Sequence, residues 1–178
     1  MFLILIFKSV TSQKCLVDLR TAQVRVVDTQ TLLSNSFALH SLDLATMKRS
    51  EQDFSVPFEV QATCNEGVCS CIVLWFDTEF SSRFCKTSPQ LLTTSPDSKP
   101  THWAQTVLPL PDFIHVVSGD STEDVEAIVA LKGRVSMSRH KGMPRRLDIS
   151  LEYSPVSKNG QMMTEKTQLY SIGVNDNS

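Results

Sequence analysis

The segment that decides the fold runs from residue 91 to residue 106 and reads LLTTSPDSKPTHWAQT. It joins a short run with β-branched residues to a second apolar run through a polar, proline-containing stretch. Each proline biases the residue before it away from helix, so Ser95-Pro96 and Lys99-Pro100 predict a loop. We therefore expect an exposed loop around His102 and Trp103, with a strand on either side.

Outward from this segment, the chain has the pattern of successive strands. Residues 54–61 and 145–153 alternate apolar and polar side chains, as half-buried strands do, and residues 68–80 are apolar on both faces in their middle. Asparagine- and glycine-containing turns at 65–67 and 158–160 separate the runs. Regular strands joined by short turns predict an all-β fold, either a barrel or a sandwich.

Prolines and glycines give more detailed expectations. Pro57 lacks an N–H, which places it at a sheet edge or a bulge. Pro109 and Pro111 are expected to end the strand that follows the loop. Gly133 is expected to break the strand over residues 125–137. The turn at 65–67 is expected to form a hairpin.

The loop and its flanks also resemble a known family. Pro96 is followed by Thr101-His102-Trp103 and Gln105, a pattern similar to the "THW loop" of the protein arginine N-methyltransferases. Three earlier segments agree with that family in order and spacing: residues 43–47, 74–80 and 82–86. The last of these is most similar to the plant form of the family's third-numbered member. The resemblance covers residues 24 to 172.

The resemblance implies an architecture. Members of the family place a Rossmann-like domain that binds S-adenosylmethionine before a β-barrel. We expect residues 21–174 to form the arginine methyltransferase-type β-barrel, after a leader or non-homologous start at 1–20 and before a polar tail at 175–178. The family's first barrel strands and dimerisation arm precede the matching region, so we expect a barrel-like domain with open edges.

Residues 1–7 form an apolar run, and Lys8 follows rather than precedes it. A membrane-spanning helix needs about 20 apolar residues. A signal peptide needs a basic start and a longer apolar core. We favour an edge strand, or a start imposed by a truncated gene model, with a signal peptide as the minor alternative.

The cofactor-binding half of the family has no counterpart here. Its Gly-rich turn needs closely spaced glycines. The six glycines of this chain, at 67, 119, 133, 142, 160 and 173, never follow a G-x-G spacing. The family's pair of catalytic glutamates is also missing. We expect no cofactor-binding and no catalytic residue in this chain, although full-length members use S-adenosylmethionine.

By resemblance, Thr101, His102 and Trp103 are the substrate-binding residues. In the family, the histidine pairs with an acidic group of the other domain and the tryptophan lines the channel for the substrate arginine. An indole face attracts a planar guanidinium cation, which suits that role. The alternative is a triplet that merely packs a turn.

Composition argues against several other classes of function. The net charge of −2 argues against nucleic-acid binding, which needs clustered cations. We interpret Lys141 with Arg145-Arg146 as a solvated turn, and His40, His115 and His140 as ordinary surface or edge histidines. The five cysteines lack the paired spacing of a metal site and favour reduced thiols in the cytoplasm or nucleus.

Two functional hypotheses follow. The first is a fragment, splice form or truncated product of a protein arginine N-methyltransferase, which supplies substrate contacts and dimerisation but is inactive alone. The second is a stand-alone, non-catalytic module that binds a methyltransferase partner or arginine-rich peptides. The expected partners are arginine-containing protein substrates and a partner chain or second copy, with no nucleic acid and no membrane.

Overall fold

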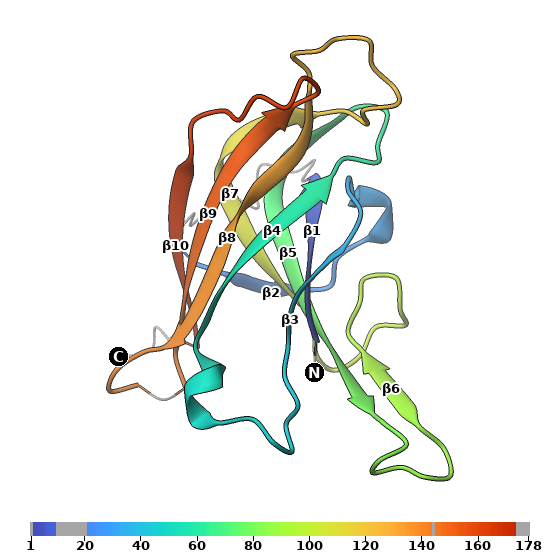
Figure 1. The fold of residues 1–178 in the computed structure, drawn as a ribbon, viewed down its shortest axis with the longest axis vertical. Helices are drawn as coiled ribbons and strands as arrows, with labels where there is room; N and C mark the ends of the chain where they lie inside the picture. Colours follow the sequence, from blue (N-terminus) through green and yellow to red (C-terminus); the bar gives the residue numbers. More distant parts are fainter. Residues whose placement is uncertain (1, 10–20, 144, 174–178) are drawn as a thin grey trace.

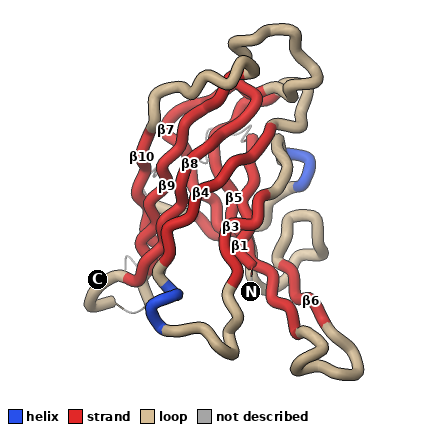
Figure 2. Tube along the Cα trace, in the orientation of Figure 1, coloured by secondary structure: helices blue, strands red, loops and turns tan. Residues whose placement is uncertain are grey.

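The computed structural model describes residues 2–9, 21–143 and 145–173, which form two antiparallel sheets that face each other (Figure 1). Strands make up most of this part of the chain, and its two helices are single 3-10 turns, η2 (Thr29–Thr31) and η3 (Arg49–Gln52) (Figure 2). The strands are β1 (Phe2–Ser9), β2 (Gln23–Arg25), β3 (Phe37–Ser41), β4 (Phe54–Gln61), β5 (Gly67–Phe80), β6 (Gln90–Thr93), β7 (Gln105–Val116), β8 (Ile128–Arg139), β9 (Leu147–Ser157) and β10 (Lys166–Ile172).

One sheet has the order β2-β7-β5-β1-β3, with β6 paired to the far end of β5, and the other has the order β10-β9-β8-β4. Single bridges join the sheets at both sides, Thr21 to Ser171 and Ser34 to Ala62. Among the described residues, no continuous ladder closes the structure into a complete barrel. The expected all-β, barrel-like domain with open edges is confirmed.

The main core lies between the sheets and includes Leu74, Leu108, Leu131, Leu151 and Tyr153. A second, smaller core covers the other face of β5. It contains Cys71, Val73 and Trp75 from β5, together with Val27 and Val107. This explains the strand that is apolar on both faces: its middle, including Trp75, is buried from both sides.

The register of β5 changes at Ser70. Residues two apart on a regular strand share a face, yet Cys69 belongs to the main core and Cys71 to the smaller one. The pairing with β7 shifts between these two cysteines, with Cys69 opposite Ile114 and Cys71 opposite Pro109. The irregularity turns the strand over, so that it supplies both cores.

The prediction that Pro109 and Pro111 end a strand is wrong, and the register change of β5 explains why. β7 continues through both prolines to Val116. Residues 110–113 have no Cα partner on β5, because this stretch faces the single residue Ser70. Pro111 is exposed there and lies where no ladder hydrogen bond to β5 is required of it.

Gly133 also does not break its strand. β8 runs unbroken from Ile128 to Arg139, and Gly133 pairs with Phe58 and Tyr153. A Cβ atom at this position would lie 1.9 Å from the carbonyl oxygen of Glu152, so only glycine permits this close approach of β8 and β9. The glycine therefore marks tight packing between strands, not an interruption.

The sheet order decides two further predictions, which concern Pro57 and the turn at 65–67. β4 is an edge strand, so the expected edge position of Pro57 is confirmed. The turn at 65–67 is not a hairpin turn, because β4 pairs with β8 whereas β5 pairs with β1 and β7. That turn carries the chain from one sheet to the other.

The apolar start forms β1, which pairs with β5 on one side and β3 on the other. It is thus an interior strand rather than the expected edge strand. The tail at 175–178 lies outside the described residues. In the part of the chain that the structure describes, no helix has the length and apolar content needed to cross a membrane.

Candidate functional site

Thr101, His102 and Trp103 lie in the loop between β6 and β7, as expected. His102 is exposed, and the Trp103 side chain remains 51% exposed in spite of its size. The Thr101 hydroxyl donates a hydrogen bond to the carbonyl oxygen of Trp103 at 2.7 Å, which fixes the tight turn around His102. The three residues therefore form one local unit at the surface.

Trp103 lies among other aromatic rings. The His102 ring is edge-on to it, with centroids 5.9 Å apart, and Phe76 of β5 contacts it in a T-shaped arrangement at 6.3 Å. Edge-to-face contacts of this kind orient an aromatic ring without covering both of its faces. The indole is therefore held in place while part of its surface is open to a ligand.

Buried polar groups anchor both ends of this loop. Gln105, only 5% exposed, donates to the carbonyl oxygen of Thr94 at 2.7 Å and accepts from the backbone N–H of Val27 at 2.8 Å. The Thr94 hydroxyl donates to the carbonyl oxygen of Phe76 at 2.8 Å. The Gln105 side chain thus links the start of β7 to the first residue of the loop and to the segment after β2.

Besides Asp97 within the loop, two carboxylates lie on the neighbouring strand β5. Asp77 and Glu79 lie two residues apart on this strand and therefore share a face, but only Glu79 is exposed. The Oδ1 atom of Asp77 and the indole nitrogen of Trp75 are buried and have no hydrogen-bond partner among the described residues.

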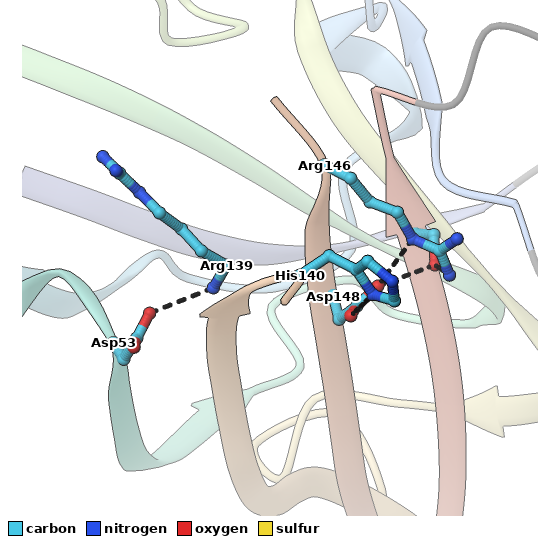
Figure 3. Close-up of polar contacts among 6 residues, drawn as sticks. Asp53, Arg139, His140, Arg146 and Asp148 are labelled. Atoms are coloured by element: carbon cyan, nitrogen blue, oxygen red, sulfur yellow. Dashed lines mark hydrogen bonds and ion pairs between the residues drawn. The ribbon is translucent and has the colours of Figure 1, made fainter. Parts of the chain in front are cut away.

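A second polar cluster lies elsewhere, at the end of the sheet formed by β4, β8, β9 and β10 (Figure 3). Asp148 contacts His140 Nδ1 at 2.7 Å and accepts from Arg146 Nε at 3.0 Å. Ser171 of β10 accepts from Arg146 at 2.9 Å and donates to Asp148 at 3.1 Å. The network ties the loop between β8 and β9 to β10.

The electrostatics of this cluster centre on Asp148. The hydrogen bond from His140 lowers the pKa of the Asp148 carboxyl below its ordinary value, and the bonds from Arg146 and Ser171 act in the same direction. Charged partners favour the ionised carboxylate. Asp148 is therefore the anion that pairs with Arg146.

The sequence interpretation missed this cluster. It treated His140 as an ordinary histidine and Arg145-Arg146 with Lys141 as a solvated turn. Arg145 and Lys141 are indeed exposed, but Arg146 is an ion-pair partner of Asp148. The only sequence signal was the Arg146-x-Asp148 spacing at a strand start, which places both side chains on one face.

No metal site accompanies either group of residues: the described residues contain no cluster of three or more His, Cys, Asp or Glu side chains that could hold an ion. Cys69 and Cys71 are buried, and Cys64 and Cys85 are partly buried. Burial raises the pKa of the Cys64 thiol, which disfavours its reactive thiolate form.

Comparison with known proteins places these features in a family. Residues 5–158 match the family model described as the arginine methyltransferase oligomerization subdomain. The chain belongs to the protein arginine methyltransferase family. The resemblance drawn from the THW segment is thereby confirmed.

Curated relatives include the probable protein arginine N-methyltransferase 3 of Arabidopsis thaliana, 38% identical over 164 residues. The corresponding rice protein is 34% identical over the same length. Each alignment covers 84% of this chain, but only 27% and 26% of the relative. The chain thus spans about a quarter of the length of these relatives.

Solved structures show the same fold. The Trypanosoma brucei PRMT1 enzyme-prozyme heterotetrameric complex with AdoHcy matches with a TM-score of 0.80 at 20% identity, over 97% of this chain and 56% of that chain. The Arabidopsis thaliana protein arginine methyltransferase 10 matches with a TM-score of 0.81 at 17% identity, over 97% and 59%. Both likenesses concern the fold alone.

Proposed function

We propose that this chain is the substrate-contacting and oligomerising barrel portion of a protein arginine N-methyltransferase, with Trp103 as the contact for the substrate guanidinium. The observation that supports this most directly is the Trp103 ring, 51% exposed and oriented by Phe76 and His102. A guanidinium over such a ring gains about 0.5–2 kcal/mol, depending on how dry the contact is.

Methyl transfer requires a cofactor-binding domain in addition. S-adenosylmethionine, when bound by such a domain, supplies the methyl group. In this proposal, Trp103 orients the substrate arginine, and His102 meets an acidic group of the other domain. Thr101 keeps the turn in shape through its bond to the Trp103 carbonyl. The chain alone binds no cofactor and transfers no methyl group.

The test joins the chain to a cofactor domain. A chimera that fuses the cofactor domain of the Arabidopsis relative to this chain should methylate an arginine-rich peptide, and the isolated chain should not. Calorimetric titration of the isolated chain with S-adenosylmethionine should give no binding. Micromolar cofactor binding by the isolated chain, or a folded chimera without activity, would contradict the proposal.

A stand-alone interaction module is the second candidate, and one observation favours it. β1 fills an interior place in its sheet, between β5 and β3, so the described strands form two sheets without a strand from another chain. Such a module would bind a methyltransferase partner, a second copy or arginine-rich peptides. We propose that either form resides in the cytoplasm or nucleus, in keeping with five cysteines that lack the paired spacing of a disulfide framework.

A further inference from the structure

A basic surface hollow lies where the turn η3 meets the end of β8, on residues to which the proposed function gives no role. Its volume is about 560 Å³, and its lining includes Arg49, Asp53, Arg139, His140 and Lys141. We call it the basic hollow. The lining comes from two segments about 90 residues apart in the sequence, residues 49–53 and 139–142.

Hydrogen bonds fix these two segments against each other. The Asp53 carboxylate accepts the backbone N–H of Arg139 at 3.0 Å, and the Arg139 side chain extends away from that carboxylate (Figure 3). On one side, the Glu51 carboxylate stabilises the turn η3, because it accepts the backbone N–H of Lys48 at 2.6 Å. On the other side, the bond from His140 to Asp148 holds the loop after β8. The hollow is therefore preorganised.

The cations of the hollow are unpaired. Asp148 already neutralises Arg146, whereas Arg49, Arg139 and Lys141 form no ion pair within the described residues. The single lining carboxylate, Asp53, uses one oxygen for the Arg139 backbone. Three cationic side chains and one carboxylate thus line a single opening. In a chain of net charge −2, this concentration of positive charge is local.

We propose that the basic hollow binds the phosphate group of a phosphate monoester, carried by a phosphorylated serine or threonine of a protein or by a small metabolite. Two guanidinium groups and an ammonium group match the several acceptor oxygens and the double negative charge of a monoester. The volume lies within the range of ordinary small-ligand sites and leaves room for the group that carries the phosphate.

The arrangement disfavours a nucleic-acid backbone as the ligand. A nucleic acid presents a row of phosphates and needs a stripe or groove of cations along it. Here the unpaired cations Arg49, Arg139 and Lys141 surround one opening. A single phosphate group fits that distribution better than a chain of them.

The test is a titration of the ¹⁵N-labelled full chain, followed by NMR, with three probes: inorganic phosphate, a phosphoserine peptide and its unphosphorylated form. Phosphate and phosphopeptide should produce saturable shifts confined to residues 49–53 and 139–142. Sodium chloride at matched ionic strength and the unphosphorylated peptide should not. If inorganic phosphate binds but the phosphoserine peptide does not, the source of the phosphate group is a small metabolite.

Variants and competing ligands complete the test. Arg49→Gln with Arg139→Gln should weaken phosphate binding about tenfold or more, equivalent to about 1.4 kcal/mol. The matched control is Arg134→Gln, an exposed arginine on the same strand β8 but outside the hollow, which should leave the affinity unchanged. Equal weakening by both, shifts reproduced by chloride, or tighter binding of an RNA oligonucleotide than of the phosphopeptide would overturn the proposal. Spectra of the variants confirm that they remain folded.

Discussion

The loop between β6 and β7 and the loop between β8 and β9 carry the two polar features of this molecule, but different interactions hold them. Neutral, buried hydrogen bonds from Gln105 and Thr94 anchor the first. A half-exposed network of charged side chains around Asp148 anchors the second. The first loop leaves aromatic rings at the surface, and the second leaves cations there.

This difference has a consequence for stability. Leaving a buried hydrogen-bonding group without its partner lowers the free energy of unfolding by about 1–3 kcal/mol, and salt has little influence on this cost. Half-exposed ion pairs contribute about 0–1 kcal/mol and are screened by salt. The first loop should therefore be insensitive to solution conditions, whereas the second should respond to both salt and pH.

The largest expected effect comes from Gln105→Leu. The change leaves the carbonyl oxygen of Thr94 and the N–H of Val27 without their partner in a buried setting. Two such groups predict a loss of about 2–4 kcal/mol in the free energy of unfolding, measured by urea denaturation. Gln90→Leu, at an exposed position of β6, is the control and should cost less than about 0.5 kcal/mol. Similar losses for both variants would contradict the anchoring role of Gln105.

Asp148→Asn should have a smaller effect. It removes the negative charge that pairs with Arg146 and contacts His140, while keeping the size of the side chain. Because the Asp148 side chain is 37% exposed, we expect a loss of only about 0.5–1 kcal/mol. In about 1 M salt this loss should shrink, whereas the loss from Gln105→Leu should not. A salt response shared by the two variants would remove the contrast between the loops.

The pH dependence of that effect has a definite sign. The folded-state pKa of Asp148 is lowered from 3.8, chiefly by the hydrogen bond from His140. Its contribution to stability is therefore present above pH 3.8 and is lost as the pH falls through the lower, folded-state value. Melting temperatures of the wild type and Asp148→Asn, measured from neutral to acidic pH, should converge at the acidic end. A difference that grows on acidification would contradict the pairing.

The sequence predicted the strands well because their signals are local. The alternation over residues 54–61 corresponds to β4 and that over 145–153 to the first part of β9. The family resemblance added the barrel-like architecture, which alternation alone left open between barrel and sandwich. The exposed loop at His102 and Trp103 was predicted from the two prolines that precede it.

The predictions that were wrong concern residues whose structure depends on long-range packing. Pro111 is tolerated inside β7 because β5 changes register at Ser70, and Gly133 continues β8 because Glu152 approaches it closely. Neither partner can be read from the residues around the proline or the glycine. The basic hollow was missed for the same reason, since Arg49 and Arg139 meet only after β4 has paired with β8.

The smallest effect on stability, and the largest on function, is expected for Trp103→Ala. The indole is half exposed on a loop, so its removal should leave the melting temperature of the chimera nearly unchanged. The cation–π contact it offers is worth about 1 kcal/mol or more in a partly dry site, which predicts that kcat/KM for an arginine peptide falls about fivefold or more.

The kcat/KM of the Trp103→Ala chimera, measured beside its melting curve, is therefore the most direct test of the account. We predict a lower kcat/KM at an unchanged melting temperature. An unchanged kcat/KM with a collapsed melting temperature would show that Trp103 only packs the loop, and would contradict the proposed role of the barrel in binding the substrate arginine.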